Sequence, residues 1–231
     1  MIKIIDFHSH ILPCADHGSD SLGTTRAQLT AMSEAGIDIA IATPHFYPNR
    51  HHVNEFLQRR DNAYAELSKL DEAKNIKVVK GAEVLLCEGM HKMDGLDRLC
   101  IDGTKTILLE MPMLDRWSNS LLDTVDEIYR SELNVVMAHV DRYPEKEVDR
   151  LMEIGVDVQI NADAMCRIFG GKARFIAMAR YRRVCGLGSD LHGAKKGCMK
   201  NFQKACAVFG DELLTDIMTR SESLIKGTFE L

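Results

Sequence analysis

The segment IIDFHSHILPCADHGSD, residues 4–20, joins an apolar run to two histidines one residue apart, followed by a third histidine and two aspartates. The spacing of His8 and His10 places both side chains on the same face of an extended segment. An isolated His-x-His pair is a weak signal, because it also occurs by chance on protein surfaces. The alternative is that these residues form the first wall of a metal site.

Short apolar runs rich in Ile and Val alternate with amphipathic segments along the rest of the chain. Such alternation predicts an α/β fold with a parallel sheet or barrel covered by helices. Seven strands are expected, at 2–7, 37–43, 76–83, 105–110, 134–140, 156–161 and 184–188. Helices are expected between them, at 24–35, 54–73, 118–130, 145–154 and 171–181, and two more close the chain at 198–209 and 211–220. Residues 89–103 are less regular and are expected to form a surface excursion with a short helix.

The chain of 231 residues is long enough for one barrel domain, which we expect to span 1–231. No apolar run is long enough to cross a bilayer, and the amino terminus lacks the features of a secretion signal. The 29 basic and 34 acidic residues are interspersed and give a net charge of −5, which does not indicate nucleic acid as a partner. Seven cysteines without a CxxC pair favour reduced thiols and a cytoplasmic protein.

Polar residues end most of the expected strands. In a parallel barrel the loops after the carboxyl ends of the strands build the active site, so these residues should meet at one rim. Taken singly, Glu83 could be a solvated charge and His139 a core histidine. Glu110 is harder to explain in this way, because an acid directly after a buried strand needs a partner. The set comprises His8, His10, His45, Glu83, Glu110, His139, Asp190 and His192.

Imidazole and carboxylate ligands together suit zinc, manganese or iron. Five histidines and three carboxylates are too many for one ion, since a zinc site uses three or four protein ligands. The sequence therefore predicts two or three divalent ions. Two ions about 4 Å apart can clamp the oxygens of a phosphoryl group, so hydrolysis of a phosphate ester is the expected reaction.

The ordered motifs resemble the PHP (polymerase and histidinol phosphatase) superfamily. They are HSH at 8–10, TPH at 43–45, GAE at 81–83, LLE at 108–110, AHVDRY at 138–143, QIN at 159–161 and SDLH at 189–192. Within that superfamily, HSHILP with a following D-x-G turn, GAE and AH-x-x-RY are similar to bacterial PHP-type protein tyrosine phosphatases encoded with capsule and exopolysaccharide genes. The resemblance implies a single-domain distorted (β/α)7 barrel, similar to a TIM barrel, with three metal ions. Manganese is the first expectation, with iron or zinc as alternatives.

The resemblance also implies roles for individual residues. One ion would be held by His8, His10, Glu83 and Asp190, with Glu83 bridging to a second ion. That second ion would be held by Glu110 and His139, and a third by His45 and His192. Arg142 occupies the place of an arginine that binds phosphate, so we expect Arg142 and Asp190 to act in catalysis.

Two positions depart from the family pattern. Where relatives read DDG, this chain has Asp16, His17 and Gly18. His17 is the expected substitute ligand of the third ion, although Asp16 could turn inward instead. Relatives also carry an arginine soon after the SDLH motif, where this chain has Lys195 and Lys196. These lysines are either substrate contacts or solvated loop residues, and a lysine lacks the fork of an arginine.

The expected function is hydrolysis of protein phosphotyrosine by a metal-activated water. No cysteine has an arginine six residues later, which excludes the thiolate mechanism of other tyrosine phosphatases. The resemblance points to a bacterial tyrosine kinase that controls capsule or exopolysaccharide synthesis as the substrate. Two alternatives stay open: a small-molecule phosphatase of the histidinol phosphate type, and a metal-binding regulatory protein with weakened catalysis.

Overall fold

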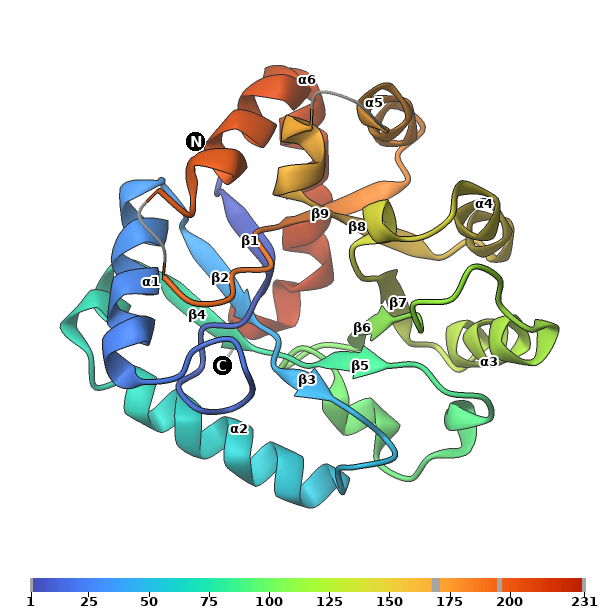
Figure 1. Ribbon diagram of the computed structural model, residues 1–231, viewed down its shortest axis with the longest axis horizontal. Coiled ribbons are helices and arrows are strands. Elements are labelled where there is room, and N and C mark those ends of the chain that lie inside the picture. Colours follow the sequence, from blue (N-terminus) through green and yellow to red (C-terminus); the bar gives the residue numbers. More distant parts are fainter. Residues whose placement is uncertain (1, 168–170, 195–196, 230–231) are drawn as a thin grey trace.

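The computed structural model describes residues 2–167, 171–194 and 197–229. Within these ranges nine parallel strands form two sheets, in the orders β1-β2-β4 and β3-β5-β6-β7-β8-β9. The strands lie at the centre of the molecule, and the helices surround them (Figure 1). Their bounds are β1 Ile5–Ser9, β2 Ile39–Ala42, β3 His45–Phe46, β4 Lys77–Lys80, β5 Glu83–Leu85, β6 Thr106–Glu110, β7 Asn134–Met137, β8 Asp157–Asn161 and β9 Val184–Gly188.

Two of the seven expected strands are interrupted. The expected strand at 37–43 ends as β2, and the chain then forms β3; likewise the strand at 76–83 becomes β4 and β5. Pro44 lies at the first break, where proline has no N–H to continue the ladder. Backbone hydrogen bonds span the breaks, from Thr43 N to Ser9 O at 2.9 Å, from Gly81 N to Ala42 O at 2.8 Å and from Glu83 N to Pro44 O at 3.1 Å. Each interrupted strand therefore changes sheets while keeping its place in the barrel.

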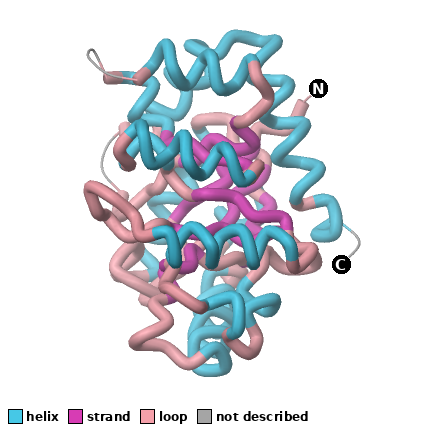
Figure 2. The backbone as a smooth tube through the Cα atoms, turned by 90° about the vertical axis from the view of Figure 1, so that its right-hand side faces the viewer, coloured by secondary structure: helices cyan, strands magenta, loops and turns pink. Residues whose placement is uncertain are grey.

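The helices follow the expected order, but the helix expected at 54–73 ends at Leu67 and is followed by the separate 3₁₀ helix at Asp71–Asn75. α6 contains both helices expected at the end of the chain, and they are separated at Gly210, whose φ of 70° and ψ of 169° are not helical. The layer of helices outside the strands is also visible after a quarter turn (Figure 2). The α-helices are α1 Leu22–Glu34, α2 Val53–Leu67, α3 Asn119–Arg130, α4 Glu145–Ile154, α5 Lys172–Arg180 and α6 Lys200–Leu224. Short 3₁₀ helices lie at η1 Asp71–Asn75, η2 Met90–Lys92, η3 Leu96–Leu99, η4 Val140–Arg142, η5 Ala162–Cys166 and η6 Lys226–Phe229, so the excursion at 89–103 contains two of them.

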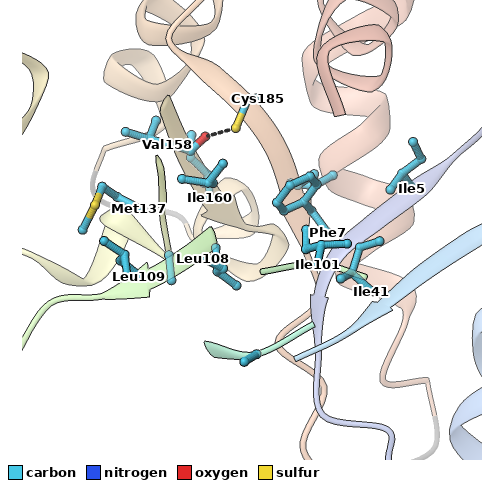
Figure 3. Packing of buried hydrophobic residues seen from close by; sticks show 14 of the residues in the cluster. Ile5, Phe7, Ile41, Ile101, Leu108, Leu109, Met137, Val158, Ile160 and Cys185 are labelled. Atoms are coloured by element: carbon cyan, nitrogen blue, oxygen red, sulfur yellow. Dashed lines mark hydrogen bonds between the residues drawn. The ribbon is translucent and has the colours of Figure 1, made fainter. Parts of the chain in front are cut away.

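One cluster of buried apolar side chains links the strands to each other and to the helices. Figure 3 shows part of it, with side chains from β1, β2, β6, β7, β8 and β9. Within the described ranges, no helix combines the length and the apolar character needed to cross a membrane.

Asp6 joins the first strand to the last at the point where the barrel closes. Its fully buried Oδ1 accepts hydrogen bonds from Ser189 N at 2.8 Å and His8 N at 3.3 Å. Its Oδ2 has no hydrogen-bond partner among the described residues. Burial raises the pKa of Asp6 to about 6, despite the hydrogen bonds from Ser189. The ionised carboxylate therefore holds β1 against β9 at an energetic cost.

We predict that Asp6→Asn removes a loss of stability that the metal-free wild type shows as pH rises. The pKa of Asp6 is higher in the folded than in the unfolded protein, so wild type loses stability as pH rises from about 4 to about 6. The asparagine side chain of the variant does not titrate. From pH 5 to pH 8 the stability of the variant relative to wild type should therefore rise by about 1 kcal/mol. Urea unfolding at both pH values measures it. A difference in stability that does not change with pH would contradict this explanation.

Candidate metal centre

Four ligand atoms from β1, β5 and the loops after β1 and β9 lie close together. His8 Nε2 and His10 Nε2 lie 3.0 Å apart. Glu83 Oε2 lies 3.4 and 3.3 Å from these two nitrogens, and Asp190 Oδ1 lies 3.6 and 3.4 Å from them. All four side chains are nearly inaccessible to solvent. Because metal–ligand bonds are about 2.0–2.2 Å long, four atoms at these separations have the spacing of ligands around one ion.

Glu83 lies at the centre of a larger set of ligand atoms. Its Oε1 lies 2.7 Å from His139 Nε2, and its Oε2 lies 2.8 Å from His45 Nδ1. Glu110 approaches the same two histidines, at 3.6 Å from His139 Nε2 and 3.9 Å from His45 Nδ1. Glu83 thus contacts ligands expected for all three ions.

A third group of imidazoles lies on the more open side of the cluster. His10, His45 and His192 each offer a nitrogen within 4.8 Å of the others. The exposed ring of His17 lies 4.8 Å from that of His45 and 4.7 Å from that of His192, measured between ring centroids. His10 and His45 also belong to the groups described above, so the three groups overlap.

Asp16 turns inward and has its own hydrogen bonds. Its Oδ2 lies 2.7 Å from His10 Nδ1 and accepts from His45 N at 3.0 Å, while its Oδ1 accepts from Gly18 N at 2.8 Å. Gly18 has no space for a side chain, because a Cβ there would lie 2.1 Å from that of His10. The Asp16 carboxylate thus orients two histidines and leaves the ring of His17 facing the cluster.

The donor set fits divalent ions. Among the described residues, His45 Nδ1, Glu83 Oε2 and His192 Nε2 are buried without a hydrogen-bond partner, although the first two lie only 2.8 Å apart. Buried polar atoms normally have partners, and such exceptions need an explanation. A cation between imidazoles and carboxylates provides one, and the mixture of nitrogen and oxygen donors suits manganese, iron or zinc.

The charges of the cluster are strongly coupled. Burial opposes ionisation of Glu83, but His8, His10, His139 and His45 hold the pKa of its carboxyl well below the usual range. The pKa of Asp190 is likewise lowered against burial by His10 and His192. Glu110 shows the reverse, because burial and the neighbouring Glu83 raise its pKa to about 7. A divalent cation would relieve this repulsion between carboxylates.

A family model for capsular polysaccharide synthesis proteins, CpsB/CapC, matches residues 4–220. The chain belongs to the CpsB/CapC family. This assignment confirms the resemblance to capsule-associated phosphatases that the motifs indicate.

Curated CpsB/CapC relatives match along most of the chain. The tyrosine-protein phosphatase CpsB of Streptococcus pneumoniae is 26% identical over 208 residues, covering 82% of this chain and 83% of the relative. That of Streptococcus agalactiae is 22% identical and covers 98% of this chain and all of the relative.

Solved structures confirm the α/β barrel. A chain from the structures of YwqE from Bacillus subtilis and CpsB from S. pneumoniae, described as unique metal-dependent tyrosine phosphatases, superposes with a TM-score of 0.76. It is 25% identical, with 97% of this chain and 95% of that chain covered. Histidinol phosphate phosphatase from Lactococcus lactis matches with a TM-score of 0.51 at 16% identity, over 98% of this chain and 94% of that chain, and this likeness concerns the fold alone.

Arg142 lies beside the cluster in this CpsB/CapC protein. It ends η4, the short helix that begins directly after His139, and the φ of His139 is 32°, in the left-handed region. Its guanidinium forms an ion pair with Asp190 Oδ2, and its side chain is 40% exposed. Lys195 and Lys196, the other expected substrate contacts, lie outside the described residues.

The structure adds Gln159 to the residues around the CpsB/CapC site, a side chain for which the sequence assigned no role. Gln159 is fully buried in β8, and its Oε1 accepts from His139 N at 2.7 Å. The signal available in the sequence was a long polar side chain in the middle of the apolar strand VDVQIN. Such a residue needs hydrogen-bond partners inside the barrel.

Proposed function

We propose that this protein is a metal-dependent phosphatase that hydrolyses phosphotyrosine in proteins. The observation that supports this most strongly is the central place of Glu83, whose carboxylate contacts His8, His10, His45 and His139. Such a carboxylate can join two cations, which is the arrangement used to clamp a phosphoryl group. Membership of the CpsB/CapC family and the tyrosine-protein phosphatases among its curated relatives support the same reaction.

The proposed ligand sets follow the three groups of side chains. His8, His10, Glu83 and Asp190 would hold the first ion, and Glu83, Glu110 and His139 would hold the second. His17, His45 and His192 would hold the third, because Asp16 already accepts hydrogen bonds from backbone groups and is paired with His10. When bound, divalent ions lower the pKa of a water molecule and withdraw charge from phosphoryl oxygens. Manganese is our first choice, with iron and zinc as alternatives.

The open side of the cluster faces the substrate. His192 and Arg142 have side chains 31% and 40% exposed, and His17 is exposed as well. The free part of the Arg142 guanidinium binds the phosphate, and its contact with Asp190 keeps it beside the reacting group. A site opening onto the surface suits a phosphotyrosine carried by a protein. Tyr47, stacked on His45 at 5.2 Å between centroids, lies at the same side.

The physiological substrate in this proposal is a bacterial tyrosine kinase that regulates capsule or exopolysaccharide synthesis. Its phosphorylated tyrosines would be presented in the cytoplasm. The seven cysteines, all within the described part of the chain, are free thiols, which suits that reducing compartment.

A comparison of substrates tests the proposed function. The manganese-loaded protein should hydrolyse a phosphotyrosyl peptide with a kcat/KM at least ten times that for histidinol phosphate. Both reactions can be followed by phosphate release under identical conditions. Turnover of histidinol phosphate alone would favour the small-molecule phosphatase, and hydrolysis of neither substrate would favour the regulatory protein.

We predict that Arg142→Ala lowers kcat/KM for the phosphotyrosyl peptide by roughly 10–100-fold, since a charge-assisted hydrogen bond contributes about 1.5–3 kcal/mol. Arg142→Lys should recover part of the loss, because it keeps the charge without the fork. The matched control is Arg130→Ala, which removes a surface arginine paired with Asp126 on α3. Equal effects of the two alanine variants would argue against a phosphate contact for Arg142.

A further inference from the structure

Two buried amide side chains on β8 connect two of the proposed metal ligands. Gln159 and Asn161 are 0% and 2% exposed, and both lie inside the barrel on the same side of β8. Gln159 Oε1 lies 3.4 Å from His8 Nδ1, and Gln159 Nε2 lies 2.9 Å from Asn161 Oδ1. Asn161 Nδ2 in turn lies 2.9 Å from Asp190 Oδ2. A continuous chain of hydrogen bonds therefore runs from His8 to Asp190.

One backbone group determines which atom donates and which accepts in each of these hydrogen bonds. His139 N–H can only donate, and it lies 2.7 Å from the side-chain oxygen of Gln159. This contact fixes which end of the Gln159 amide is the oxygen, so the NH₂ end must donate to Asn161 Oδ1. The NH₂ of Asn161 is then turned to Asp190 and donates to its carboxylate.

The same order of donors and acceptors determines the tautomer of the His8 imidazole. An amide oxygen can only accept, so the His8 nitrogen that faces Gln159 carries the proton. The other nitrogen, Nε2, is then free to bind a cation beside His10 and Glu83. Hydrogen bonds of this kind orient metal-binding histidines and fix their tautomer.

Close packing leaves Gln159 little freedom to turn. Gly188 on β9 lies against it, and a Cβ at that position would be 2.4 Å from Gln159 Nε2 and 2.8 Å from His8 Cβ. The glycine is therefore required by the adjacent side chains. The backbone of Asn161 is held by a hydrogen bond, which its N–H donates to Asp141 Oδ1 at 2.9 Å.

We propose that Gln159 and Asn161 form a directional amide relay that positions His8 and Asp190 for metal binding. Gln159 acts as a positioning residue, because it contacts two ligand residues at once: the ring of His8 and the backbone of His139. The relay also places an N–H donor on Asp190 Oδ2, which leaves Oδ1 facing the histidines. This inference rests on the metal centre of the proposed function and adds the groups that hold its ligands.

The experiment measures Mn²⁺ affinity of the full chain by calorimetric titration, together with thermal unfolding of the metal-free protein. Gln159→Leu removes both acceptor and donor at similar size and should weaken the tightest Mn²⁺ site by roughly 10–100-fold. Gln159→Glu keeps an acceptor for His8 and His139. Because about one hydrogen bond is retained, this variant should bind Mn²⁺ at least about three times more tightly than the leucine variant. Ser221→Ala is the control, since it removes a fully buried hydrogen bond to Cys185 O, away from the cluster.

A purely structural role for Gln159 predicts a different result. The leucine variant would then unfold at a lower temperature, as Ser221→Ala does, but would keep its Mn²⁺ affinity within about two-fold, and this outcome would overturn the relay. If Gln159→Leu does not fold, Asn161→Leu tests the other half, and an unchanged affinity there would also overturn the proposal. Weaker Mn²⁺ binding by the variants than by wild type would support the relay even if no substrate is hydrolysed. In that case only the proposed function would be wrong.

Discussion

Replacing Glu83 with glutamine should lower the rate of phosphotyrosine hydrolysis by roughly 1,000-fold or more, because the variant loses several kcal/mol of charge stabilisation at the reacting group. The amide has the size of the carboxylate but no negative charge, and only one of its two ends can bind a cation. Glu83 contacts four histidines, and each of its oxygens faces a different set of them. No other carboxylate among the described residues contacts as many of the proposed ligands. The loss should appear in kcat and be accompanied by lower metal content.

The control for this variant is Glu55→Gln, an exposed glutamate in the first turn of α2. It makes the same chemical change outside the site and should leave kcat and metal content unchanged. Metal content separates two explanations for an inactive Glu83→Gln protein. If that protein keeps wild-type metal content and at least a tenth of wild-type activity, Glu83 is not the central ligand.

Removal of the metal ions should abolish hydrolysis and also destabilise the fold. The metal-free cluster concentrates three carboxylates and several imidazoles in a buried space, and the pKa of Glu110 is raised to about 7 by burial and by Glu83. Mn²⁺ at about 1,000 times its dissociation constant should stabilise the folded state by about 4 kcal/mol. For a chain of this size that corresponds to a rise of roughly 10 °C in Tm.

Thermal unfolding before and after chelation measures this effect independently of activity, and addition of Mn²⁺ to the chelated protein should restore both Tm and hydrolysis. The Glu83→Gln variant serves as the matched control, since its Tm should respond much less to Mn²⁺. Hydrolysis that persists after complete chelation would exclude a metal-dependent reaction. An unchanged Tm would place any bound ions outside the buried cluster.

The sequence predicted the barrel and the residues of the candidate site for one physical reason. Parallel strands all end at the same rim, so polar residues that follow apolar runs, such as His139 and Asp190, had to meet there. The spacing of His8 and His10 likewise put both rings on one face, where their Nε2 atoms lie 3.0 Å apart. The family assignment confirms the motif-based resemblance.

Other features depend on contacts that a linear pattern does not contain. The break after β2 follows from Pro44, but the transfer of β3 to the second sheet depends on its pairing with β5. The inward turn of Asp16 is set by the backbone of Gly18 and His45. The role of Gln159 depends on His139 N and His8, which lie 20 and 151 positions away along the chain.

The most direct test of the central claim is the number of metal ions bound per chain. Elemental analysis of wild-type protein, loaded with Mn²⁺ and freed of unbound ions by gel filtration, should give two or three ions per chain. One ion or none would contradict a shared cluster in which His8, His10, Glu83, His139 and Asp190 hold adjacent cations.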